Sequence, residues 1–241
     1  MAGINEFFTP GDQRAASVNA LFAAIATRYD RINDVQSLGL HRRWKRRVVE
    51  LAHVKPGNLA LDVCCGTGDI ARALAGRGAR VTGLDFSQEM LSVAKSREAV
   101  GQPSSVNYQH GDAMKLPFPN ASFDVVTVGY GLRNLADWEV GLSEMVRVAK
   151  PGARLLVLDF GKPDNSLWRA AYFSYLRVCV PLFGLLFCRN AAAYAYILES
   201  LKHFPAQRGV ETKMHALGLT AVRIHNLLGG AMSINVGLKP G

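Results

Sequence analysis

The chain has 241 residues, of which 49% are hydrophobic and 20% charged, so its composition excludes a disordered protein and allows one large domain or two small ones. The net charge of +9 favours a nucleic acid, an anionic membrane surface or an acidic substrate as partner, although a basic solvated surface gives the same value. The four cysteines lack metal-ligand spacing and a disulfide framework, and residues 1–13 lack a signal-peptide core. We therefore expect a cytoplasmic protein without a metal site.

The N-terminal part, residues 17–53, is expected to form a helical lid. Apolar residues recur with a helical period over Val18–Tyr29 and again over Leu40–Leu51, whereas Tyr29–Asp34 breaks the pattern. The second helix is densely basic around Trp44, which is typical of a solvated face. A membrane-surface or substrate-lid role for this helix also stays open.

Short apolar runs alternate with helical patterns through the middle of the chain. Such alternation predicts a parallel sheet with helices on both faces, in which ligands bind beyond the carboxyl ends of the strands. The expected strands are Leu59–Val63, Arg80–Leu84, Val106–Gln109, Phe123–Gly129 and Arg154–Phe160, and the expected helices are Asp69–Ala75, Gln88–Val100 and Trp138–Ala149. A turn is expected at Pro151-Gly152.

A helical insertion is expected over residues 161–203, where the alternation stops. Its apolar run Ala170–Cys188 is barely long enough to span a membrane, and Arg177 and Pro181 interrupt it. The run therefore favours an apolar pocket, or contact with a membrane surface, over a transmembrane helix. The last expected elements are the helices Ala191–His203 and Pro205–Ala216 and a closing hairpin of Ala221–Leu227 and Ala231–Leu238, which makes the sheet mixed.

A glycine-rich turn, Gly66-Thr67-Gly68, joins the first expected strand to a helix. Glycines allow a sharp bend and the close approach of a ligand. With Ala71, the turn also fits the dinucleotide fingerprint, so an NAD-linked dehydrogenase is an alternative. Asp62 argues against that reading, because a pyrophosphate would not favour a carboxylate inside its site.

Three carboxylates, those of Asp62, Asp85 and Asp112, stand at or just after the ends of three successive expected strands. One of them alone would suit a helix cap or a surface charge. Together they suit a cationic nucleoside ligand without a phosphate chain. S-adenosylmethionine is such a ligand, because it carries an amino group, a ribose diol and a sulfonium.

The chain resembles the class I S-adenosylmethionine-dependent methyltransferases, which have an α/β Rossmann-like fold with a seven-stranded, mostly parallel sheet and an antiparallel last strand. More closely, it is similar to the quinone-ring C-methyltransferases of menaquinone and ubiquinone synthesis. The match runs over nearly the whole length and implies one domain over residues 1–241. The residues that carry it include Tyr29–Asp34, Ser37–Lys45, Leu61–Asp69, Leu116–Pro119, Gly131–Asn134, Tyr196–Leu201 and Phe204-Pro205-x-Gln207.

The resemblance implies the residues of the site. The predicted cofactor-binding residues are Asp62, Gly66, Thr67, Gly68, Asp85, Phe86, Asp112, Ala113 and Gly129; the predicted catalytic residues are Arg133 and Asn134; and the predicted substrate-binding residues are Tyr29, Tyr130 and Arg133. Relatives often have Ser at Gly129. They also have Leu-Glu-Phe-Ser where Leu158–Gly161 stands here, and such departures affect substrate choice rather than methyl transfer.

The implied reaction is C-methylation of a polyprenylated quinol, demethylmenaquinol to menaquinol. The alternatives are 2-methoxy-6-polyprenyl-1,4-benzoquinol, in ubiquinone synthesis, and another small lipophilic acceptor. A ring carbon becomes nucleophilic when the ring hydroxyl ionises, and a nearby cation stabilises the anion. Arg133 is the candidate cation, and because arginine stays protonated it would stabilise the phenolate or orient a water. The competing interpretation of Arg133 is a structural salt bridge.

Partners follow from the same reasoning. We expect the quinol as substrate, peripheral contact with the inner face of the membrane, and no nucleic acid. Amino-methylating nucleic-acid enzymes usually carry an Asn-Pro-Pro-Tyr type of motif after strand four, and this chain has Gly129–Leu132 there. The sequence leaves open a homodimer, as well as a non-catalytic scaffold in quinone synthesis.

Overall fold

The centre of the molecule is a sheet with strand order β3-β2-β1-β4-β5-β7-β6 in a computed structural model that describes residues 18, 20, 22–98, 106–188 and 192–241. The strands are β1 (Leu59–Val63), β2 (Arg80–Asp85), β3 (Val106–His110), β4 (Phe123–Gly129), β5 (Ala149–Phe160), β6 (Thr220–Leu227) and β7 (Met232–Leu238). Strands β1 to β5 pair in parallel, and β7 runs antiparallel to β5 and β6. This confirms the predicted mixed sheet.

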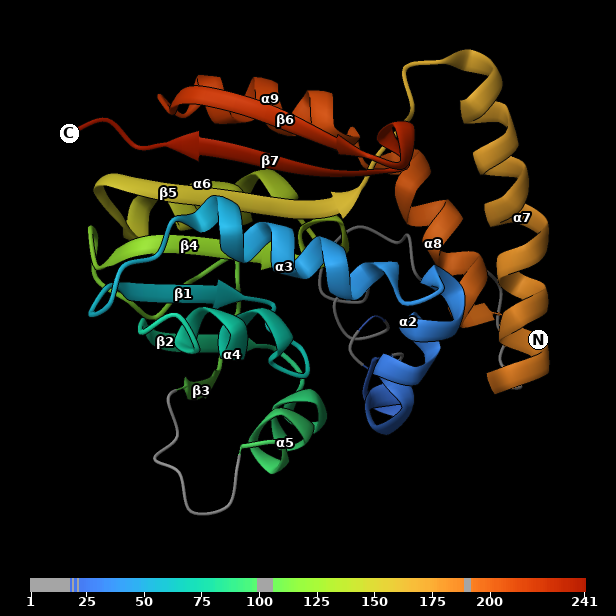
Figure 1. Cartoon of the computed structure of the whole chain (residues 1–241), viewed down its shortest axis with the longest axis horizontal. Coiled ribbons are helices and arrows are strands. Elements are labelled where there is room, and N and C mark those ends of the chain that lie inside the picture. Colours follow the sequence, from blue (N-terminus) through green and yellow to red (C-terminus); the bar gives the residue numbers. More distant parts are fainter. Residues whose placement is uncertain (1–17, 19, 21, 99–105, 189–191) are drawn as a thin grey trace.

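Helices cover both faces of the sheet (Figure 1). Helices α3 (Leu40–Ala52), α4 (Asp69–Ala75) and α5 (Gln88–Ser96) pack on one face, and α6 (Trp138–Val148) and α9 (Ala206–Ala216) pack on the other. Each face has its own buried cluster, which forms because apolar residues recur at the helical period on the inner side of every helix.

Three further helices lie beyond the carboxyl ends of the parallel strands, at the right of Figure 1: α2 (Tyr29–Ser37), α7 (Ser166–Cys188) and α8 (Ala192–His203). The chain order of the sheet reverses between β1 and β4, and this is the point where open α/β sheets bind their ligands. The fold therefore places α2 and α7 beside the expected ligand edge. None of the helices formed by the described residues is long and apolar enough to cross a membrane.

The predicted break at Tyr29–Asp34 is wrong, because these residues form most of helix α2. The real break follows at Leu38 and Gly39, whose φ angles are +50° and +76°. Polar side chains of this helix, such as Asp30, contact residues far away in the sequence. They stand where an amphipathic helix would have apolar residues, so the sequence lacks the apolar period of a helix here. Upstream, the predicted helix over 18–29 is helical where it is described and becomes a 3-10 turn at Ala26–Arg28.

Strand β5 begins five residues before the expected start and takes in the predicted turn at Pro151-Gly152. Phe123 pairs with Ala149, but Val125 pairs with Arg154, so the residues between them loop out of register. The backbone is therefore irregular at the predicted turn, Pro151-Gly152, but this irregularity lies within β5 rather than before it. The predicted Gln88–Val100 helix is too long, because α5 ends at Ser96 with Arg97 as its C-cap; residues 99 and 100 lie outside the described residues.

Candidate active site

The glycine turn after β1 is held by the neighbouring strand. The N–H of Cys65 donates to the Leu84 carbonyl at 3.0 Å, and Gly66 and Gly68 have φ angles of +54° and +80°. A Cβ on Gly66 would meet nothing within 4 Å, whereas one on Gly68 would lie 2.3 Å from the Tyr108 hydroxyl. The turn therefore leaves open space on one side for a ligand and rests on Tyr108 on the other.

Asp85, at the end of β2, is bonded directly to this turn. Its carboxylate accepts the Gly66 N–H at 2.7 Å and the Ser87 N–H at 2.9 Å. Burial raises the pKa of Asp85, and these backbone hydrogen bonds act in the opposite direction. The predicted ribose-binding carboxylate and the glycine turn thus form one rigid unit.

Asp62 is almost wholly buried between β1 and β4. Its carboxylate accepts the Thr127 hydroxyl at 2.7 Å. Desolvation raises the pKa of Asp62 to about 7, and the Thr127 hydrogen bond opposes the shift. Asp62 is the next-to-last residue of β1, so its carboxyl is buried beside β4 just before the glycine turn begins.

The buried position of Asp62 predicts a fall in stability with rising pH. The carboxyl loses its proton at a pKa of about 3.8 in the unfolded chain and about 7 in the folded one, so folding binds a proton between these values. The free energy of unfolding should fall by about 1.4 kcal/mol per pH unit across this window and then level off. Urea unfolding of wild type and Asp62→Asn at several pH values measures this contribution, which the variant should lack; equal slopes for the two proteins would contradict it.

The remaining predicted cofactor residues lie at the same edge of the sheet. Asp112 follows β3 and accepts the Met114 N–H at 2.8 Å, and Ala113 is buried. Phe86 is exposed, with its ring centroid 5.6 Å from that of His110. Gly129 ends β4, and a Cβ there would lie 2.6 Å from a methyl of Ile70.

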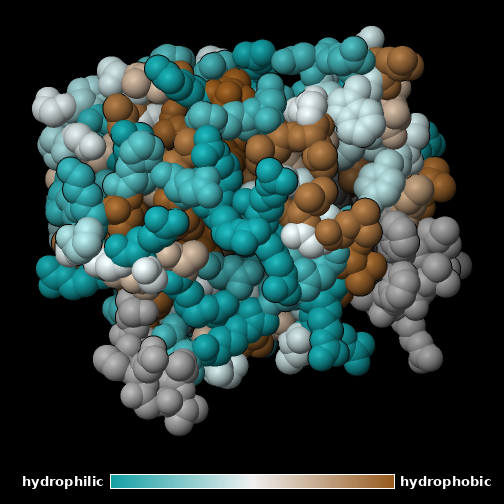
Figure 2. Space-filling view, viewed as in Figure 1, coloured by the Kyte–Doolittle hydropathy of each residue, from teal (hydrophilic) through white to brown (hydrophobic). Residues whose placement is uncertain are grey.

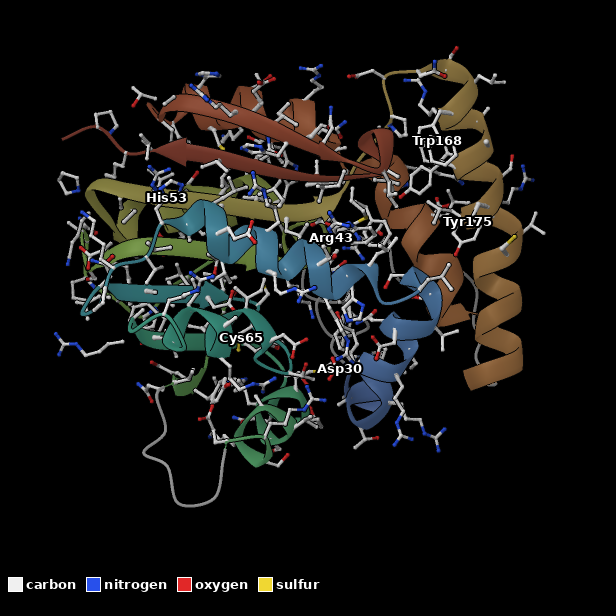
Figure 3. The ribbon with its side chains drawn as sticks, in the orientation of Figure 1. Asp30, Arg43, His53, Cys65, Trp168 and Tyr175 are labelled. Atoms are coloured by element: carbon white, nitrogen blue, oxygen red, sulfur yellow. The ribbon has the colours of Figure 1, made fainter. Side chains whose placement is uncertain are left out.

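Helices α2 and α3 are tied to the cofactor turn by polar contacts. The Thr67 hydroxyl donates to Asp30 at 3.0 Å, and Asp30 also pairs with Arg97. Lys45 of α3 pairs with Asp69 of α4 at 2.8 Å. Figure 3 shows Asp30 where α2 approaches α4 and α5. The described N-terminal helices therefore close over the predicted cofactor site, with Thr67 already engaged by one of them.

A cavity of about 580 Å³ opens next to this site. Most of its wall is apolar and comes from α2, α3 and α7. Residues before α2, the loop after β4, the end of β5 and the connection from β6 to β7 also contribute. Its lining includes Tyr29, Ile32, Gln36, Leu38, His41, Trp44, Tyr130, Arg133, Phe160, Trp168, Tyr172, Tyr175 and Leu228. Figure 3 shows Trp168 and Tyr175 on α7 at the outer side of this region. All three predicted substrate-binding residues meet in one apolar cavity.

Arg133 is buried in the cavity wall. Its Nη1 donates to an Asp159 oxygen at 2.7 Å and to the Tyr130 carbonyl at 2.9 Å, and its guanidinium lies 4.5 Å from the centroid of the Phe160 ring. The Asn134 amide donates to the same carbonyl at 3.0 Å. The ion pair that was the competing interpretation of Arg133 is present, and Arg133 also lines the cavity.

Several residues of this site are not among those predicted from the sequence. Asp159 and Phe160 end β5 at the same sheet edge, so the strand-end rule that singled out three aspartates would also have found Asp159. Asp30, Gln36 and His41 had no such signal, because their positions follow from how α2 and α3 dock on the sheet.

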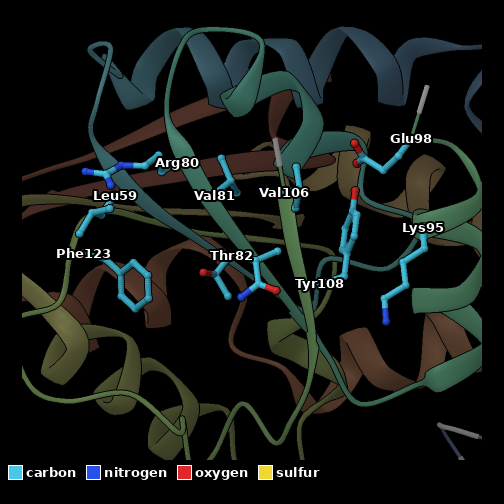
Figure 4. Close-up of a pocket in the computed structure, with 10 residues that line it drawn as sticks. Leu59, Arg80, Val81, Thr82, Lys95, Glu98, Val106, Tyr108 and Phe123 are labelled. Carbon is cyan, nitrogen blue, oxygen red and sulfur yellow. The ribbon is translucent and has the colours of Figure 1, made fainter. Parts of the chain in front are cut away.

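A second cavity, of about 750 Å³, lies at the opposite edge of the sheet (Figure 4). It is lined by the amino-terminal parts of β1, β2, β3 and β4 and by the end of α5 with Glu98 after it. None of the predicted site residues is among those that line this second cavity. Although it has the larger volume, we therefore do not assign the active site to it.

The fold and the glycine turn with its strand-end carboxylates define a class I methyltransferase. A chain of the complex between the Haloferax volcanii Trm112 methyltransferase activator and the putative methyltransferase has a TM-score of 0.66 at 18% identity, over 91% of this chain and 98% of that one. A putative S-adenosyl-L-methionine-dependent methyltransferase of Methanococcus maripaludis has a TM-score of 0.62 at 17% identity, over 90% and 92% of the two chains.

Sequence relatives give the family. The model of the ubiE/COQ5 methyltransferase family matches residues 10–239. The demethylmenaquinone methyltransferase of Desulfitobacterium hafniense (strain Y51) is 42% identical over 95% of this chain and 92% of its own length. The ubiquinone/menaquinone biosynthesis C-methyltransferase UbiE of Ectopseudomonas mendocina (strain ymp) is 42% identical over 96% and 92%. The chain belongs to the ubiE/COQ5 methyltransferase family, and its methyl donor is S-adenosylmethionine.

Proposed function

We propose that this enzyme methylates a ring carbon of a polyprenylated quinol, with demethylmenaquinol as acceptor and menaquinol as product. The observation that carries the proposal is the mainly apolar cavity beside the glycine turn, with Arg133 in its wall. A quinol ring and the start of its tail are apolar and flat, and aromatic side chains favour such ligands. The names of the two relatives above support the quinone ring as the target.

The donor site fits S-adenosylmethionine in its chemistry. Gly66, Thr67 and Gly68 would receive the amino acid part, with Asp62 beneath them. The Asp85 carboxylate would accept from the ribose hydroxyls, beside Phe86, and Asp112 and Ala113 would hold the adenine next to Gly129. When bound, the donor supplies a methyl group on a sulfonium. Open space above Gly66 and the fixed carboxylate of Asp85 are the features of this chain that accommodate it.

Arg133 acts at the ring in this proposal, and Asn134 positions it. Asp159 and Phe160 hold the Arg133 guanidinium still, so it can stabilise an oxyanion on the ring without reorganising. Asn134 binds the Tyr130 carbonyl and fixes the loop that carries both residues. Tyr29 and Tyr130 form walls of the ring pocket.

Residues 1–241 act as one domain in this proposal. The helices within the 17–53 lid close the cavity on one side, and α7, within the 161–203 insertion, closes it on the other.

The tail of the substrate leads to a membrane surface in this proposal. Five large hydrophobic residues that line the cavity are also exposed, so they form its mouth: Val35, Leu38, Trp168, Tyr175 and Leu228. Leu167 and Val178 extend the patch along α7, where Figure 2 shows hydrophobic side chains on the right of the molecule. Exposed Arg169 and Arg177 of the same helix suit anionic lipid. We place the enzyme peripherally on the inner face of the membrane.

The mouth residues should control binding to lipid. Leu38 and Leu167 are 88% and 80% exposed, so aspartate at both positions costs the fold little. We expect Leu38→Asp with Leu167→Asp to weaken binding to anionic vesicles about tenfold or more, because each leucine contributes buried apolar area at the membrane. Val140→Asp, at an exposed position of α6, is the matched control. High salt should release the wild type as well, and sedimentation with vesicles measures both effects. Equal binding by all variants would place the contact elsewhere.

The choice of acceptor is tested directly by competition. Reduced demethylmenaquinone and reduced 2-methoxy-6-polyprenyl-1,4-benzoquinone are offered together with methyl-labelled donor, and the lipids are separated by mass. We expect the label on the naphthoquinol. Label on the benzoquinol alone would assign the enzyme to ubiquinone synthesis, and label on neither would contradict the proposal.

A further inference from the structure

We propose that His41 is the general base that takes the proton from the ring hydroxyl of the acceptor. This inference rests on the proposed function, because the acceptor must be a phenol bound in the cavity. His41 belongs to α3, is almost wholly buried and lines the cavity. Three features of the structure carry the inference: the tautomer of the ring, the free nitrogen and the lack of another base in the described cavity wall.

The contacts of Ser37 fix the tautomer of His41. The Ser37 hydroxyl lies 2.6 Å from the Asn33 carbonyl, which can only accept, so its single hydrogen is used there. The same oxygen lies 2.8 Å from Nδ1 of His41 and must therefore accept from it. Nδ1 thus carries the ring proton, and Nε2 of the neutral ring carries a lone pair. The break at Leu38 and Gly39 produces this arrangement, because it brings the end of α2 over the start of α3.

The Nε2 atom of His41 is buried and has no hydrogen-bond partner among the described residues. Buried polar atoms are nearly always paired, so an unpaired one at a cavity points to a ligand. Gln36 Nε2 and the Tyr130 hydroxyl are two further unpaired atoms, and both residues also line this cavity. Such polar atoms in an otherwise apolar cavity match an acceptor with hydroxyl groups on an apolar ring.

The surroundings of His41 keep it neutral. Burial lowers its pKa first and the charge of Lys45 second, with Arg42 adding to this effect. The carboxylates of Asp34 and Asp69 raise it, and Asp34 lies 3.8 Å from Nδ1. A neutral ring can accept a proton, and Asp34 stands where it can stabilise the imidazolium that forms.

Other titratable groups in the described cavity wall are poorer bases. Arg133 stays protonated, and Asp159, which is paired with it, is not among the residues that line the cavity. Burial raises the pKa of Tyr130, Tyr172 and Tyr175, so these groups stay protonated at neutral pH. His41 thus divides the work with Arg133: one accepts the proton and the other stabilises the resulting anion.

The ring O–H bond breaks and its proton forms an N–H bond at Nε2 of His41. The phenolate electron pair moves through the ring to the carbon, which bonds to the methyl group while the methyl–sulfur bond breaks toward sulfur. The methylated carbon then loses its hydrogen as a proton to solvent water, and His41 returns its proton to the ring oxygen. One proton is released in total.

The test replaces His41 by glutamine, which can still accept a hydrogen bond but cannot take up a proton under these conditions. With donor bound and demethylmenaquinol in excess, we expect His41→Gln to slow single-turnover methyl transfer about 100-fold and to lose the rise in rate that the wild type shows as His41 is deprotonated. His53→Gln is the matched control, because His53 is an exposed histidine at the end of the same helix. It should behave like the wild type.

A second readout does not depend on turnover. In ¹⁵N-labelled wild-type protein, the histidine signal that disappears in His41→Gln should show a proton on Nδ1, and its Nε2 signal should move when an unreactive quinol analogue binds. A proton on Nε2, or a His41→Gln enzyme with the wild-type rate and pH profile, would overturn the inference. If the wild type itself transfers no methyl to a quinol, the proposed function fails instead, so the two failures are distinguishable.

Discussion

Replacement of Asp85 by alanine should weaken S-adenosylmethionine binding by about 2–4 kcal/mol, or about 30- to 1000-fold in dissociation constant. Two losses add up in this variant. The ribose hydroxyls lose a charged acceptor, and the Gly66 N–H loses the carboxylate that holds the turn at 2.7 Å. Titration calorimetry measures the change.

Glu50→Ala is the matched control for Asp85→Ala, because it removes an exposed carboxylate that is paired with Arg47 on the outer side of α3. It should leave the affinity unchanged. An Asp85→Ala protein that binds the donor as the wild type does would show that the strand-end carboxylate is not part of the donor site.

Replacement of Arg133 by alanine should have two large and separable effects. The variant leaves the buried Asp159 carboxylate without its partner, and such a loss costs about 3–5 kcal/mol of stability. It also removes the cation at the ring, which should lower methyl transfer about 100-fold or more while donor affinity stays nearly intact. Chemical unfolding and single-turnover transfer measure the two effects on the same preparation.

The double variant Arg133→Ala with Asp159→Asn separates these effects. Stability should return in large part, because no unpaired charge stays buried, whereas transfer should stay slow. Arg133→Lys should recover only part of the rate, since lysine keeps the charge but loses the planar fork. If activity returns together with stability in the double variant, Arg133 is purely structural and the competing interpretation holds.

The sequence predicted most of the sheet and its ligand edge. Six of the seven strands lie within one residue of their predicted bounds, because local apolar periods mark them in the sequence. The rule that ligands bind beyond the carboxyl ends of parallel strands correctly predicts that Asp62, Asp85 and Asp112 lie on the same side of the sheet. Helix α2 could not be predicted from an apolar period, because it carries polar residues such as Asp30 and Asp34. Their partners, Thr67 and Arg42, are identified only by the fold.

The catalytic side of the site was harder to predict for the same reason. Arg133 was found through a motif, but its ion pair with Asp159 joins residues 26 positions apart in sequence. His41 looked like one more basic residue of a solvated helix. Only the docked position of α3 reveals that its ring is buried in the cavity wall.

The central claim is that ionisation of a quinol in the cavity drives methylation of its ring carbon. Its most direct test is incubation of the enzyme with methyl-labelled S-adenosylmethionine and demethylmenaquinone, in parallel in the reduced and the oxidised form. We expect one labelled methyl per ring on carbon, stable to ether-cleaving reagents, from the reduced form and none from the oxidised form, which has no hydroxyl to ionise. Label on oxygen, or equal labelling of the two forms, would contradict the account.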